Sequence, residues 1–171
     1  MKLNKKKLLA FIRGAMSELG YVEFDDPSSD ANLFVKEYGG LFLTIGFTIS
    51  RLYEDSFTCN YYLSRTTSWS ECWGDVPRKI YVRPGELMTP QERYDITIDP
   101  RCKNNPEYMS DMWWNAFDSN GKYDPLSLKS LTDAIILTEG RVSEQPNIVE
   151  KIYTSKVLEA IYNKVSRTIE I

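Results

Sequence analysis

The sequence contains no histidine, and this absence excludes several kinds of catalytic and metal site. Without an imidazole, the 171-residue chain cannot build a Ser-His-Asp or Cys-His nucleophile system by itself. Zinc sites that need histidine, and the site of two histidines and one carboxylate, are excluded for the same reason. Neither glycine-rich phosphate-binding motif occurs. The sequence therefore assigns no catalytic residue, metal ligand or cofactor, although carboxylate, tyrosine or arginine chemistry remains open.

Cysteines and long apolar runs are also scarce. The three cysteines, Cys59, Cys72 and Cys102, have no C-x-x-C spacing, which favours buried reduced thiols over disulfides or a zinc site. The apolar run at residues 8–12 is too short for a signal peptide, and no run reaches the ~18 residues that span a bilayer. We expect a cytoplasmic protein that does not enter a membrane.

The charge balance lacks the basic excess that duplex nucleic acid requires, since the net charge is −3 and the pI about 5.1. The charges are unevenly spread. Residues 1–13 carry five bases and no acid, whereas residues 86–150 carry twelve acids against six bases. We interpret both regions as solvated faces. The alternative is an acidic surface that meets a basic partner protein.

Side-chain alternation over residues 41–63 gives the clearest structural signal. Apolar residues occupy every second position of 41–49 and of 57–63, and Gly39-Gly40 predicts a tight turn after a strand at 33–38. The pattern predicts an antiparallel meander with one buried face and one wetter face. Shorter strands are expected at 21–24, 79–83 and 94–98.

Helices are expected on both sides of this meander. Residues 5–19 have helical apolar spacing between a cap at Asn4 and a stop at Gly20. Further helices are predicted from Asn105-Pro106 through Phe117, from Asp124-Pro125 to Gly140, and along the tail from Pro146. The sequence thus predicts a single α+β domain over residues 1–171, with an antiparallel sheet covered on one face by N-terminal and C-terminal helices.

Aromatic and arginine side chains in the turn-rich segment 65–83 form the predicted binding site. Trp69 and Trp73 share a face whether the segment is a strand or a helix. Trp, Tyr and Arg dominate binding hot spots, and the candidate residues are Arg65, Trp69, Trp73, Arg78, Tyr81 and Arg83. Two alternatives are that the tryptophans only cover the core edge, and that the segment binds single-stranded nucleic acid.

The order of features resembles bacterial α+β domain families of the immunity-protein-like kind. The resemblance lies in a helix that ends at Leu19-Gly20, a meander, and a late Trp113-Trp114 pair. It implies a non-enzymatic protein-interaction module, of immunity or regulatory type, whose partner is another protein. Two alternatives stay open: an enzyme that uses carboxylate, Tyr or Arg groups, and a structural domain that pairs strand edges in a homodimer.

Overall fold

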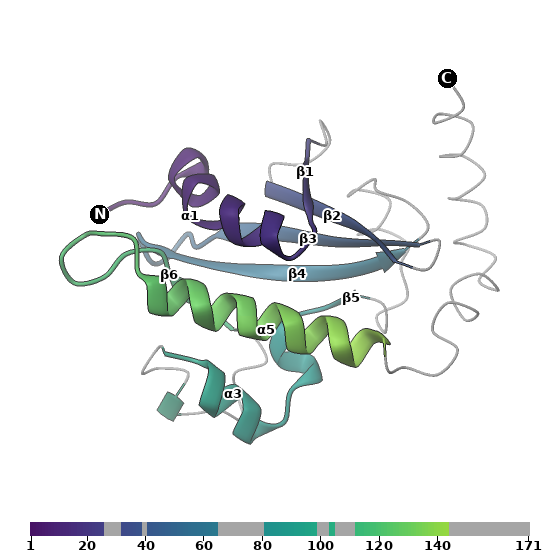
Figure 1. Cartoon of the computed structure of the whole chain (residues 1–171). Coiled ribbons are helices and arrows are strands. Elements are labelled where there is room, and N and C mark those ends of the chain that lie inside the picture. The colour runs from purple at the N-terminus through teal and green to yellow at the C-terminus, as the bar shows by residue number, and fades with distance from the viewer. Residues whose placement is uncertain (26–31, 39–40, 65–80, 99–102, 105–111, 144–171) are drawn as a thin grey trace.

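The architecture is a curved antiparallel sheet with two helices packed on one face, as the computed structural model in Figure 1 shows. The structure describes residues 1–25, 32–38, 41–64, 81–98, 103–104 and 112–143. The strands are β1 (Val22–Phe24), β2 (Asn32–Tyr38), β3 (Leu41–Ile49), β4 (Ser56–Ser64), β5 (Tyr81–Val82) and β6 (Trp114–Asn115). The helices are α1 (Lys5–Glu18), the 3₁₀ turn η2 (Pro84–Leu87), α3 (Pro90–Ile96) and α5 (Pro125–Ser143). The predicted α+β fold with an antiparallel sheet is confirmed.

The sheet follows the predicted meander. Its order is β1-β2-β3-β4-β5, and β6 also pairs with β4, all antiparallel. Tyr38 pairs with Leu41, which is the register that a two-residue turn requires, although Gly39 and Gly40 themselves lie outside the described residues. The outermost strands of the described sheet have only two or three residues. Such short edges disfavour pairing with another chain.

Helix α1 begins and ends where the sequence predicts. The Asn4 side chain accepts a hydrogen bond from Lys7 N at 3.0 Å. At the other end, Gly20 adopts a φ of 83°, and the amides of Gly20 and Tyr21 donate to the carbonyls of Ser17 and Met16. This is a Schellman motif, which needs a left-handed residue that glycine supplies without strain.

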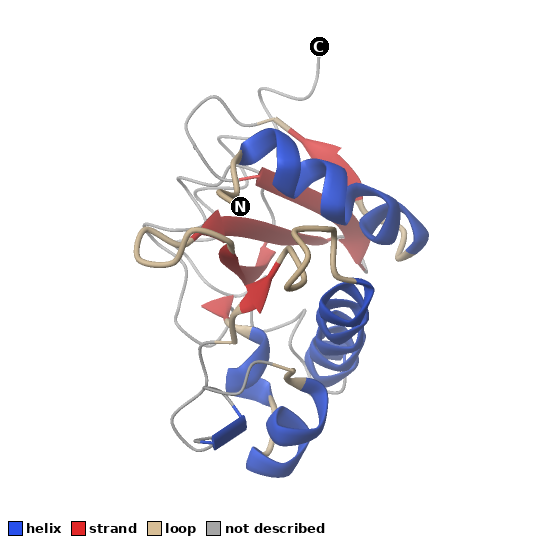
Figure 2. Cartoon of the chain, turned by 90° about the vertical axis from the view of Figure 1, so that its left-hand side faces the viewer, coloured by secondary structure: helices blue, strands red, loops and turns tan. Residues whose placement is uncertain are grey.

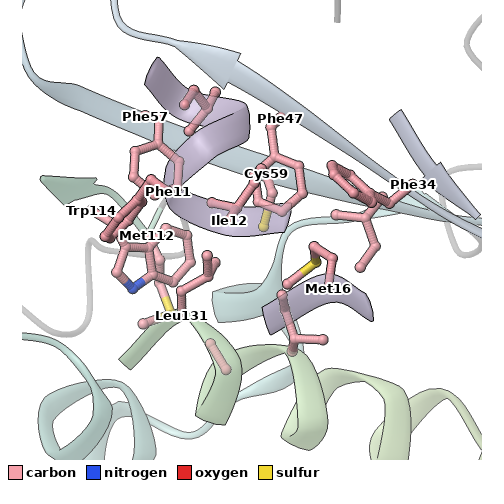
Figure 3. Packing of buried hydrophobic residues seen from close by; sticks show 14 of the residues in the cluster. Phe11, Ile12, Met16, Phe34, Phe47, Phe57, Cys59, Met112, Trp114 and Leu131 are labelled. Carbon is pink, nitrogen blue, oxygen red and sulfur yellow. The ribbon is translucent and has the colours of Figure 1, made fainter. Parts of the chain in front are cut away.

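The core lies between the sheet and the helices α1 and α5 (Figures 1 and 3). Its members are the alternate residues of β3 and β4 together with one stripe from each helix. Phe57 sits at the centre, with ring centroids 5.9 Å from Phe11 and 6.2 Å from both Phe47 and Trp114. The buried set includes Leu8, Ile12, Met16, Phe34, Leu43, Ile45, Cys59, Tyr61, Leu131, Ala134 and Ile135.

The opposite face of the sheet is less exposed than the alternation predicts. Thr44, Gly46, Asn60 and Tyr62 lie on that face in the middle of β3 and β4, and all four are buried. The prediction of a wetter face is therefore wrong there. The alternation shows which side chains are polar but not which are exposed. Polar side chains can be buried when they find hydrogen-bond partners, wherever the chain covers both faces of a sheet.

Three predicted helix or strand boundaries are wrong. The segment 94–98 is not a strand, because Thr89 and Glu92 form a reciprocal capping box that starts α3 with Pro90 at its first position. The helix expected through Phe117 is replaced at its end by β6, which pairs with β4. Helix α5 continues past Gly140 to Ser143, where Arg141 donates to Glu92 at 2.7 Å. The tail from Pro146 lies outside the described residues.

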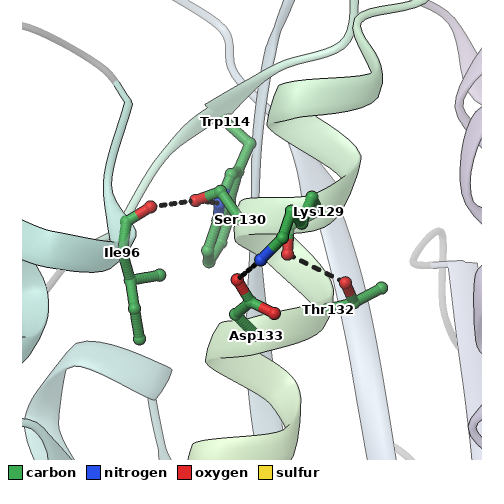
Figure 4. Close-up of polar contacts among 6 residues, drawn as sticks. All are labelled: Ile96, Trp114, Lys129, Ser130, Thr132 and Asp133. Carbon is green, nitrogen blue, oxygen red and sulfur yellow. Dashed lines mark hydrogen bonds and ion pairs between the residues drawn. The ribbon is translucent and has the colours of Figure 1, made fainter.

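Trp114 connects α5, β6 and α3 through a buried hydrogen-bond chain (Figure 4). Its indole Nε1 donates to Ser130 Oγ at 3.0 Å, and Ser130 Oγ donates in turn to the carbonyl of Ile96 at 2.6 Å. Trp114 is buried, whereas the preceding Trp113 stays partly exposed.

Two buried serines on α5 provide a matched test of this chain. We expect Ser130→Ala to lower the free energy of unfolding by about 1–3 kcal/mol, because the indole N–H and a backbone carbonyl lose their partner. We expect Ser127→Ala to be neutral or stabilising, since the Ser127 hydroxyl has no hydrogen-bond partner among the residues that the structure describes. Urea denaturation of both variants checks this, and equal losses would contradict it.

Candidate interaction surface

Most of the binding site predicted from the sequence lies outside the described residues. This holds for Arg65, Trp69, Trp73 and Arg78, so the prediction that they form a site stays a prediction. The backbone of Tyr81 pairs with Tyr62 in the sheet. Arg83 follows β5, precedes η2 and influences the thiol of Cys59 electrostatically.

Titratable side chains converge beneath the sheet, where the end of α1 meets β2 and α5. The Lys36 ammonium lies 2.6 Å from the Glu139 carboxylate and 5.4 Å from the centre of the Tyr21 ring, and it donates to the carbonyl of Leu19 at 3.2 Å. The Tyr21 hydroxyl donates to Glu139 at 3.2 Å. The two contacts of Glu139 join residues that are more than one hundred positions apart and fasten α5 to the sheet.

This cluster is better suited to stability than to catalysis. Burial raises the pKa of Tyr21 and of Tyr61, and the nearby Glu139 carboxylate raises both further. Burial likewise raises the pKa of the Cys59 thiol, an effect that Arg83 partly opposes. Side chains that hold their protons this tightly are poor bases and poor nucleophiles near neutral pH.

A different surface forms at the end of the sheet where β3 turns into β4, which faces the viewer in Figure 2. Within this turn, the Ser50 hydroxyl accepts hydrogen bonds from the amides of Leu52 and Tyr53 at 3.1 and 3.0 Å. The Glu54 carbonyl accepts from Leu3 N at 2.6 Å, and the Asp55 carbonyl accepts from Ala116 N at 3.0 Å. The turn is thereby fixed both to the residues that precede α1 and to β6.

The loop that precedes α5 reaches the same end. The Asp118 carboxylate accepts hydrogen bonds from the amides of Asn120 and Lys122, and Gly121 takes a φ of 73°. Tyr123 stacks on Phe117 with ring centroids 5.3 Å apart, and on Phe11 at 5.5 Å. Its hydroxyl donates to the carbonyl of Lys7 at 3.1 Å.

Exposed apolar side chains gather on these two loops and on the first turn of α5. Leu52 is 86% exposed, Leu126 66%, Tyr53 51% and Tyr123 43%. We call these four residues the end surface. The Asp124 side chain caps α5 by accepting from Leu126 N at 2.9 Å, so the backbone of each contributing segment is hydrogen-bonded locally.

Sequence reasoning missed the end surface because its residues are far apart in the chain. Leu52 and Tyr53 belong to a turn, whereas Tyr123 and Leu126 surround the start of a helix more than sixty positions later. One feature of the sequence could have pointed to them: large apolar residues occur inside otherwise polar turns, where the helical or strand spacing of core residues does not account for them.

Comparisons with protein-family models, with curated proteins and with solved structures gave no match. Among the described ranges, no helix is long and apolar enough to cross a membrane. In the same ranges no three Cys, Asp or Glu side chains are grouped as ligands for a metal ion.

The raised pKa values of Tyr21 and Tyr61 predict how stability changes in alkali. Both hydroxyls stay protonated in the folded protein, but in the unfolded chain they ionise near pH 10. Stability is thus constant below that pH with respect to these groups, and it falls as the pH rises further because the unfolded chain releases protons.

We expect Tyr21→Phe to make this fall less steep, by up to about 1.4 kcal/mol for each pH unit above 10. Urea denaturation from pH 8 to pH 11.5 measures the effect. The comparison uses the change with pH and not the stability at one pH, so loss of the hydrogen bond to Glu139 does not obscure it. Parallel curves for wild type and variant would contradict the assignment.

Proposed function

We propose that the protein is a non-enzymatic protein-interaction module and that the end surface is its binding site. The observation that carries the proposal is the gathering of Leu52, Tyr53, Tyr123 and Leu126 on one end of the sheet, exposed yet fixed on hydrogen-bonded turns. Large apolar side chains that stay exposed at one end of a protein, and do not join its core, favour a role in contacting another protein.

The rigidity of these turns supports binding. Ordering a mobile loop during association costs free energy that subtracts from affinity. Here Tyr123 is already stacked on two rings, and Leu52 and Tyr53 extend from a turn held by Ser50. Tyrosine also offers a large contact area with few rotatable bonds, which is why it is frequent in binding hot spots.

The alternatives receive less support from the described residues. An enzyme without histidine needs converging side chains that exchange protons, whereas the converging groups around Glu139 are engaged with one another. Dimerisation through strand edges is disfavoured by the short outer strands. The proposal includes the immunity-type or regulatory role that the sequence resemblance favours, with the cytoplasm as its place of action.

A photo-crosslinking residue tests the proposal in cells of the organism that makes the protein. Placed at position 52, it should capture a protein that mass spectrometry can identify and that the same residue at position 136 does not capture. Ile136 is the matched control because it is 55% exposed but lies on the outer face of α5.

Purified components then give the quantitative test. We expect Leu52→Ser combined with Tyr53→Ser to weaken binding of the captured partner by about 2 kcal/mol or more, since hot-spot side chains contribute that much. Ile136→Ser should leave the affinity unchanged. Calorimetry on folded variants measures this, and an unaltered dissociation constant for the double variant would refute the proposed site.

A further inference from the structure

The charge around the end surface has the opposite sign to the charge of the whole chain. The exposed bases in segments 1–7, 50–55 and 118–126 are Lys2, Lys5, Lys6, Arg51 and Lys122, whereas the exposed acids comprise only Glu54. The full chain carries a net charge of −3. A basic surface on an acidic protein is therefore a local feature and does not follow from overall composition.

The remaining carboxylates of this end are less available to a partner. Asp118 and Asp124 are half-buried, and each accepts hydrogen bonds from backbone amides. These bonds hold the pKa of Asp118 below its ordinary value of 3.8. Asp124 also lies at the N-terminus of α5, where the helix dipole offsets its charge. Asp55 is half-buried at the base of the β3–β4 turn.

From this arrangement we infer that the end surface binds an acidic protein segment that carries apolar side chains. The inference rests on the proposed function and adds the chemistry of the partner. Apolar groups of the segment contact Leu52, Tyr53 and Leu126, and its carboxylates lie beside the surrounding lysines and Arg51. Opposite charge speeds association and discriminates against basic partners, while apolar contact supplies most of the affinity.

A peptide fits this surface better than an anionic membrane does. Exposed Glu54 and the half-buried Asp118 and Asp124 lie among the bases, so the surface has mixed charge. A folded or extended peptide can place its carboxylates beside the bases and avoid the acids. A uniformly anionic lipid layer cannot make that distinction.

The test selects ligands from a random dodecapeptide library displayed on phage, using the full chain as bait. Phage that also bind the Leu52→Ser/Tyr53→Ser variant are removed. We expect the survivors to be enriched in Asp and Glu together with aromatic or aliphatic residues. A synthetic peptide of the selected sequence should bind the wild type and lose at least tenfold in affinity between 50 and 300 mM salt.

Two double variants test whether the position of the bases matters or only the net charge of the chain. Each variant lowers the net charge by two, so a difference between them comes from position. Lys2→Gln with Lys122→Gln removes bases at the end surface and should weaken peptide binding at least tenfold. Arg13→Gln with Arg141→Gln removes bases elsewhere, where both side chains form ion pairs with carboxylates, and should change affinity less than twofold. Position 141 lies ~22 Å along α5 from Leu126.

The outcomes distinguish the two proposals. Two results overturn the inference and leave the proposed function standing. In the first, the selected peptides lose binding to the Leu52→Ser/Tyr53→Ser variant but contain no acidic residues. In the second, the selected peptides bind the Lys2→Gln/Lys122→Gln variant as tightly as the wild type. If every selected peptide also binds the Leu52→Ser/Tyr53→Ser variant, the inference and the proposed function are both overturned. Binding to phosphatidylserine vesicles that is lost in the lysine variant, without any acidic peptide ligand, overturns the inference in favour of a lipid surface.

Discussion

The structure depends on the burial of one face of β3 and β4 beneath two helices that are distant in sequence. Leu43, Ile45 and Phe47 from β3 meet Phe57 from β4, and α1 and α5 cover them together. Each large apolar side chain removed from water contributes about 1.5–3 kcal/mol, which makes this layer the main source of stability. It also fixes where the ends of both helices lie, and hence which loops become neighbours.

Polar contacts then determine how α5 lies on that layer. Trp114 and Ser130 connect the middle of the helix to β6 and to the end of α3. Lys36 and Glu139 connect its last turns to β2. Apolar packing alone would tolerate small shifts of the helix, whereas hydrogen bonds and ion pairs with defined geometry favour one position. The start of α5 is consequently held at the same end of the sheet as the β3–β4 turn, because Asp124 N and the Asp55 carbonyl both hydrogen-bond to Ala116.

The proposed function combines this rigid frame with an unusual surface. In the proposal, the end surface offers apolar groups for affinity, and the exposed bases of the neighbouring segments provide selectivity. Its loops are fixed by backbone and side-chain hydrogen bonds, so little order has to be gained on binding. The mutual engagement of Tyr21, Lys36 and Glu139 supports the proposed binding role over a catalytic role for these side chains.

The sequence alone determined the α+β class, the meander and the limits of α1, because period-2 alternation and local caps such as Asn4 and Gly20 act over a few residues. It failed where distant contacts override local preference: β6 forms because Trp114 pairs beside Phe57, and α5 passes Gly140 because residues on both sides of it bind other elements. The end surface, too, was decided only by tertiary structure. Its apolar residues belong to segments that are distant in the sequence. These segments reach the same end of the sheet only when α1 and α5 pack onto it, and no local sequence pattern predicts this.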